Sequence, residues 1–68
     1  MAPTTEQLLR AELAELRQEH RDLDAAVTAL AGSANLDILQ LQRLKKKKLM
    51  IKDKISRLED QLFPDIIA

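Results

Sequence analysis

The stretch LRAELAELRQEHRDLDAAVTAL, residues 9–30, decides the fold of this 68-residue chain. Its apolar side chains recur at alternating intervals of four and three residues, with one histidine among them. The series is Leu9, Leu13, Leu16, His20, Leu23, Val27 and Leu30. This spacing is a heptad repeat over about three heptads, which is typical of helices that pack as coiled coils and also of four-helix bundles. The stretch therefore predicts one long helix with a single apolar seam.

Signals at both ends place this helix at about residues 5–31. Thr4 followed by Gln7 is typical of a capping box, in which the threonine oxygen accepts a backbone N–H and the glutamine side chain reaches back. Gly32, the only glycine, follows the end of the seam. A glycine at this point often ends a helix in a left-handed conformation, and we expect Gly32 to do so.

A second seam follows in LQRLKKKKLMIKDKISRLEDQL, residues 41–62. Its members are Leu41, Leu44, Lys48, Ile51, Ile55, Leu58 and Leu62. Asp37 is the expected N-cap with Gln40 as its capping-box partner, and Pro64 ends the helix, so that the second helix spans about residues 37–63. The connecting loop, residues 32–36, is short, which favours antiparallel neighbours.

The two seams match when the chain is folded about this loop. The seam positions meet throughout, in pairs whose residue numbers sum to 67 or 68: Val27 with Leu41, Leu23 with Leu44, His20 with Lys48, Leu16 with Ile51, Leu13 with Ile55, and Leu9 with Leu58. Agreement between the loop position and two independent heptad patterns indicates one structure. We predict an all-α fold, an antiparallel two-helix hairpin of the coiled-coil type, as a single domain over residues 1–68.

Length and composition indicate how such a hairpin is stabilised. A chain of this size buries only about 60 % of the surface that its unfolded form exposes. It has no cysteine, so neither a disulfide nor a thiolate metal site supplements the core. Self-association is the remaining means of stabilising the hairpin. We therefore expect the hairpin to assemble into a dimeric or higher bundle of the four-helix type.

One polar layer interrupts the seams, because the register places His20 opposite Lys48. We interpret His20 as a core residue. A metal-binding or catalytic role is the less favoured alternative, since no cysteine or second histidine is present to share a metal ion. Glu19, Asp22 and Asp24 lie near the histidine, so a small charge-assisted network is expected. A buried polar position costs stability but can fix the register and the number of subunits, and we assign that role to this layer.

Charge is divided between the helices, although the net charge is zero. Residues 6–24 carry six acids and three arginines, whereas residues 37–60 carry eight bases and four acids. This division favours the antiparallel hairpin and acid-to-base docking between subunits. We interpret the basic run as a solvated helix face. The alternative is contact with nucleic-acid phosphates through Arg43, Lys45, Lys46, Lys47 and Lys52.

Several apolar residues lie outside the seams, and we assign them to the interface of a dimer or tetramer. They are Leu8, Ile38, Leu39, Leu49 and Met50, together with Phe63, Ile66 and Ile67 near the end of the chain. The apolar tail, residues 64–68, is expected to pack across the open end of the bundle. The alternative is that the tail docks into another protein.

Other classes of function lack their sequence signals. A phosphate-cradling glycine loop, a nucleophile with its base and a metal-ligand constellation are all missing, so we expect no enzyme, no catalytic residue, no metal and no cofactor. No long apolar run and no basic-plus-apolar leader is present, which argues against a membrane span or a signal peptide. We expect no membrane partner and a cytoplasmic location.

The first helix contains a glutamate–histidine pair, and the second contains a lysine-rich leucine segment. These motifs belong to a set of stretches: residues 19–24, Asp37, Leu41, residues 44–49, residues 51–55, and Leu58 with Glu59. Over about residues 13–60 the chain resembles the YdcH-like family of small bacterial proteins of unknown function. The resemblance implies a cytoplasmic bacterial protein with a helical hairpin, and it implies no activity.

These observations lead to two hypotheses about function. The first is a structural or protein–protein interaction module that binds itself and, through the second helix or the C-terminal tail, another protein. The alternative is a small nucleic-acid-associated protein that uses the basic run of the second helix.

Overall fold

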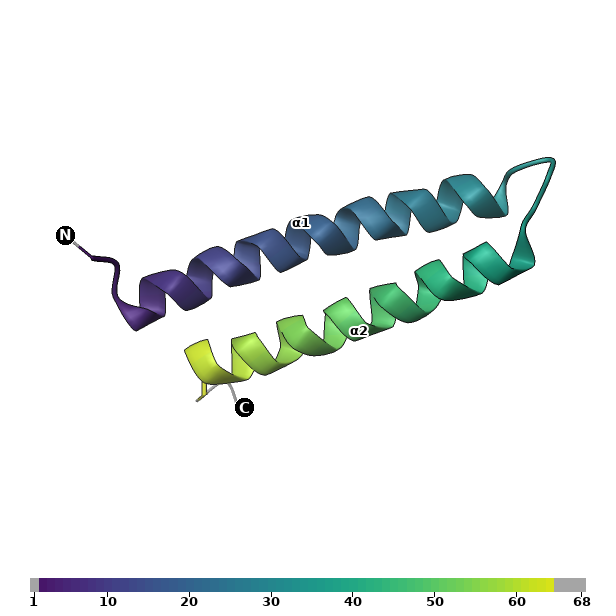
Figure 1. The fold of residues 1–68 in the computed structure, drawn as a ribbon. Coiled ribbons are helices and arrows are strands. Elements are labelled where there is room, and N and C mark those ends of the chain that lie inside the picture. The colour runs from purple at the N-terminus through teal and green to yellow at the C-terminus, as the bar shows by residue number, and fades with distance from the viewer. Residues whose placement is uncertain (1, 65–68) are drawn as a thin grey trace.

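The computed structural model describes residues 2–64, which form two α-helices joined by a short loop (Figure 1). Helix α1 spans Thr5–Ala31 and helix α2 spans Ile38–Leu62. The helices run antiparallel and pack against each other in a hairpin that measures 49 × 34 × 15 Å. The predicted all-α class, with two helices packed together, is therefore confirmed for the described residues.

Polar side chains cap the first turn of each helix. Thr4 Oγ1 accepts a hydrogen bond from the Gln7 N–H at 3.1 Å, and the Thr4 N–H donates to Gln7 Oε1 at 2.9 Å. Asp37 Oδ1 accepts from the Gln40 N–H at 3.1 Å. These bonds satisfy backbone donors that the first turn of a helix leaves without a helical partner. The local sequence thus determines where each helix begins.

The prediction that Gly32 adopts a left-handed conformation is wrong. Gly32 has φ −88° and ψ 1°, and no described residue has a positive φ. Its N–H donates to the Thr28 carbonyl at 3.2 Å, and the Ser33 N–H donates to the Leu30 carbonyl at 3.1 Å. The second bond is of the tighter 3₁₀ type, which satisfies a terminal carbonyl without a reversal of the backbone.

The core lies along the two seams. The buried side chains are Leu13, Leu16, Ile51 and Leu58, all in the half of the hairpin nearer to the chain ends. The other seam residues are half-buried, and outside the seams only Glu59 and Phe63 among the described residues are withdrawn from full exposure. No described side chain is completely removed from solvent. A single chain therefore has a thin core.

Candidate functional site

The polar layer joins the two helices through an ion pair. Lys48 Nζ of α2 donates to Asp24 Oδ1 of α1 at 2.5 Å. Asp24 lies one helical turn beyond His20 toward the loop. Of the three acids near the histidine in sequence, the structure thus brings Asp24 to the lysine.

His20 occupies its seam position without a hydrogen bond to Nε2. The residue is half-buried, and Nε2 is buried with no hydrogen-bond partner among the described residues. Buried polar atoms are nearly always hydrogen-bonded, and one without a partner lowers stability. The layer is therefore only partly satisfied within one chain.

The electrostatics of the layer centre on Asp24. The hydrogen bond from Lys48 holds the pKa of Asp24 below its ordinary value, and the positive charge of the same ammonium group adds to this effect. His20 lowers this pKa by a smaller amount, and desolvation opposes the shift. His20 and Lys48 thus both act on one carboxylate, which stays ionised at neutral pH.

A hollow of about 220 Å³ lies beside the layer, lined by Val27, Lys45, Lys48 and Leu49. Pockets that enclose small-molecule ligands usually measure about 300–1,000 Å³, so this hollow suits at most one or two side chains. Within residues 2–64, no group of three or more His, Cys, Asp and Glu side chains is placed to hold a metal ion.

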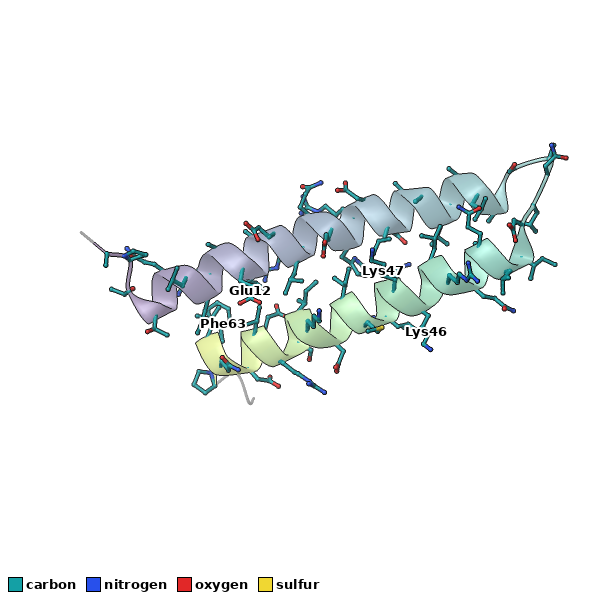
Figure 2. The ribbon with its side chains drawn as sticks, in the orientation of Figure 1. Glu12, Lys46, Lys47 and Phe63 are labelled. Atoms are coloured by element: carbon teal, nitrogen blue, oxygen red, sulfur yellow. The ribbon has the colours of Figure 1, made fainter. Side chains whose placement is uncertain are left out.

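The cations considered for phosphate contact lie around α2. All five are exposed, and none takes part in an ion pair formed by the described part of the chain; they are Arg43, Lys45, Lys46, Lys47 and Lys52. Figure 2 shows Lys46 directed away from α1, whereas Lys47 lies between the two ribbons in the same view. Their positive charge is therefore spread around the helix and does not form one stripe.

The seams divide the surface of the hairpin into two sides. Arg17 Nη2 of α1 is bonded to Glu59 Oε2 of α2 at 3.0 Å, and each of these residues directly follows a seam leucine, Leu16 or Leu58. Residues that follow a seam position thus share one side, which we call the following side. Residues that directly precede a seam position lie on the opposite side, which we call the preceding side. The sequence analysis missed this ion pair, although the positions of both residues after seam leucines could have indicated it.

The residues assigned to an oligomer interface do not form one patch. Leu8 and Met50 precede seam residues, whereas Leu49 follows Lys48. Six large apolar side chains are 44–66 % exposed: Leu8, Leu36, Ile38, Leu39, Leu49 and Met50. Leu36 was not among the predicted interface residues. Apolar surface is therefore distributed over several sides of the hairpin.

Phe63 packs within its own chain. It caps the end of α2, is half-buried, and lies against the core. The guanidinium carbon of Arg10 lies 5.4 Å from the centre of its ring, within the range of a cation–π interaction. Phe63 thus covers the open end of the hairpin (Figure 2), while Ile66 and Ile67 lie outside the described residues.

These features define a class of protein, a small antiparallel helical hairpin whose apolar seams contain one histidine and one lysine. The chain belongs to the family described as protein of unknown function (DUF465), which matches residues 13–59, more than half of its length. That family contains the YdcH-like small bacterial proteins, so the resemblance drawn from the sequence is confirmed. No curated protein and no solved structure gives a match. Neither described helix is both long and apolar enough to cross a membrane.

Proposed function

We propose that this chain is a self-associating helical hairpin that acts as a structural or protein–protein interaction module in the cytoplasm and carries out no catalytic step. One observation carries the proposal. Among the described residues only four apolar side chains are buried, whereas six large apolar side chains are 44–66 % exposed. So thin a core is marginal for a chain of this size, and association with a partner would bury part of the exposed apolar surface.

A second copy of the chain is the simplest partner for this surface. Two hairpins together form a four-helix bundle, in which each helix buries a second stripe of side chains. The exposed residues lie on both sides of the hairpin, which supports a dimer and leaves apolar surface for a tetramer or for another protein. Helix α2 and the C-terminal tail supply that further surface.

Sedimentation equilibrium tests this proposal. We expect the wild-type chain to have the mass of a dimer or tetramer, and the variant Leu49→Glu/Met50→Glu to shift to a lower mass because two interface side chains become charged. The control is Gln18→Glu, which changes an exposed residue in the middle of α1. A wild-type chain that remains monomeric at high concentration would overturn the proposal.

A second candidate function is binding of nucleic acid, supported by the five exposed cations of α2 that form no ion pair within residues 2–64. Mobility-shift assays with duplex DNA and RNA at low and physiological salt test it. For Lys46→Gln/Lys47→Gln, we expect the slope of log affinity against log salt to fall by about 0.9 for each phosphate that the variant no longer neutralises. The control Arg10→Gln/Arg57→Gln removes two cations that are paired with Glu6 and Asp53, and should leave the slope unchanged. Absence of salt-dependent binding would exclude this candidate.

A further inference from the structure

The preceding side of the hairpin carries two rows of opposite charge. The α1 row consists of Leu8, Glu12, Glu15, Glu19, Asp22, Ala26 and Ala29, and the α2 row consists of Gln40, Arg43, Lys47, Met50, Lys54, Arg57 and Gln61. The α1 row thus has four acids and no base, and the α2 row has four bases and no acid. All fourteen side chains are exposed. We call this surface the acid–base side.

The following side differs, because several of its residues already take part in contacts between the two helices. Its α1 row is mixed, with three arginines and one aspartate. The ion pair between Arg17 and Glu59 lies there, as does Asp24, the partner of Lys48. Phe63 and Glu59, the half-buried residues outside the seams, also lie on this side.

The acid–base side lacks such contacts. Of its eight charged residues, only Arg57 takes part in an ion pair of the described part of the chain, and its partner Asp53 belongs to the same helix. The ion pairs of residues 2–64 include none between the two rows. Glu12 and Lys47, one from each row, are exposed, and in the view of Figure 2 both are drawn between the ribbons. This side therefore has charge available for a partner.

We propose that two copies of the chain pair through their acid–base sides about a two-fold axis parallel to the helices, so that both loops lie at the same end. This inference rests on the proposed self-association and specifies its surface and orientation. Rotation about such an axis places the acidic α1 row of each copy on the basic α2 row of the other. A two-fold axis across the hairpin would instead place acids on acids and bases on bases, which is unfavourable.

The spacing along the helices supports this arrangement. The cross-helix contacts join residues whose numbers sum to 72–76, namely Asp24 with Lys48, Arg10 with Phe63 and Arg17 with Glu59. The acids at residues 12–22 of α1 and the bases at residues 43–57 of α2 therefore lie at overlapping heights in the hairpin, and the two-fold axis keeps each height unchanged. The acids of one copy thus lie opposite the bases of the other, and such complementarity favours one orientation over others.

Spin-label distances measure the orientation directly. Because the chain has no cysteine, Ala34→Cys places one label in the loop of each copy. Loops at the same end give a distance below about 30 Å, since neighbouring helix axes are about 8–10 Å apart. Loops at opposite ends give about 40 Å, which is the length of the 27-residue α1 at about 1.5 Å per residue. The control label Gln18→Cys lies at mid-length and gives a short distance in either orientation.

The outcomes separate this inference from the proposed function. A short distance from Ala34→Cys, together with a short distance from Gln18→Cys, supports the acid–base pairing. A distance near 40 Å from Ala34→Cys in an associated sample overturns the orientation and leaves self-association intact. A monomeric sample overturns both. This experiment keeps every charged residue of the surface unchanged.

Charge reversal identifies the surface. We expect Lys47→Glu/Lys54→Glu to raise the dissociation constant by about tenfold or more, because each change recurs on both halves of a two-fold pair. The matched control Lys45→Glu/Lys52→Glu makes the same change on the following side of α2 and should alter the constant by less than about threefold. Circular dichroism of each variant verifies that its helices form.

Mixing two reversed chains completes the test. Glu15→Lys/Glu19→Lys should also weaken self-association, whereas its mixture with Lys47→Glu/Lys54→Glu should restore pairing, since each acidic row again meets a basic row. Equal weakening by the two lysine variants, or no recovery on mixing, would overturn the assignment of this surface.

Discussion

His20 is a residue at which packing and hydrogen bonding conflict. It occupies a seam position among leucines, where an apolar side chain would pack equally well. Its Nε2 is buried and has no hydrogen-bond partner among residues 2–64. The neighbouring Lys48 uses Asp24 as its partner. The histidine therefore lowers the stability of a single hairpin.

We expect His20→Leu to raise the free energy of unfolding by about 1 kcal/mol, because the substitution removes an unsatisfied buried nitrogen and adds apolar contact. Thermal and urea unfolding at one protein concentration measure the effect. Glu19→Leu, which changes an exposed neighbour in the same helix, should give no such gain. A loss of stability in His20→Leu would show that Nε2 has a partner in the assembled protein.

The double variant His20→Leu/Lys48→Leu tests the role of the whole layer. We expect its melting temperature to rise and its assemblies to become mixed in size, because a uniform apolar seam specifies register and subunit number poorly. Sedimentation velocity measures the distribution of sizes. A single unchanged species would contradict the role assigned to the layer.

The ion pair of Asp24 with Lys48 makes the stability of the fold depend on pH. Its pKa is lower in the folded chain than its ordinary value of 3.8, so the ion pair with Lys48 stabilises the fold above pH 3.8. This stabilisation disappears as the pH falls through the lowered pKa of the folded state. The difference in melting temperature between wild type and Asp24→Asn should therefore shrink on acidification from neutral pH. In a Lys48→Met background, Asp24→Asn should have little effect on the melting temperature at neutral or at acidic pH.

At the scale of the elements, local hydrogen bonds determine the ends of the helices. The complete capping box of Thr4 and Gln7 begins α1, and the Asp37 carboxylate begins α2. The end of α1 is set by bonds from Gly32 and Ser33 to carbonyls of the last turn. A residue with a Cβ atom can therefore adopt the backbone conformation of Gly32.

Gly32→Ala should stabilise the protein by about 0.4–1 kcal/mol, because alanine restricts the unfolded chain and φ of −88° suits it. An added Cβ would lie 3.6 Å from the Thr28 carbonyl oxygen and 3.9 Å from that of Ala29, which are ordinary contacts. Urea unfolding measures the effect. Ala31→Gly, at the last residue of α1, should shift stability in the opposite direction. Destabilisation by Gly32→Ala would indicate a left-handed glycine in solution.

At the scale of the whole molecule, burial is concentrated toward the chain ends. Leu13 is 4 % exposed and Ile51 is 5 % exposed. Toward the loop, Leu23, Val27 and Leu44 are only half-buried although they continue the same seams. The half of the hairpin toward the loop is therefore the less tightly packed one.

We expect Leu13→Ala to lower the free energy of unfolding by about 2–5 kcal/mol, because it leaves a cavity in the best-packed part of the core. Leu39→Ala, at a side chain that is 58 % exposed, should change the stability of an isolated chain by less than about 0.5 kcal/mol. Unfolding measured at several protein concentrations distinguishes a loss of packing within one chain from a loss of contact between subunits. A large, concentration-dependent effect of Leu39→Ala would place that residue in the subunit interface.

Much of this architecture follows from the sequence alone, because its causes are local. A heptad spacing requires nothing beyond the helical repeat, and the Thr4–Gln7 box needs only residues three apart. The positions of His20 and Lys48 on the seams follow from the same periodicity. The ion-pair partner of Lys48 does not follow from this periodicity, because Asp22 and Asp24 lie only two residues apart in the chain.

The sequence by itself thus determined two helices and the seams along which they pack. Only the tertiary structure decided that Lys48 bonds to Asp24, that Phe63 packs under Arg10, and that Arg17 bonds to Glu59 on the following side. These contacts depend on the rotation and axial offset of one helix against the other. A difference of a fraction of a turn changes which side chains meet, and periodicity does not specify it.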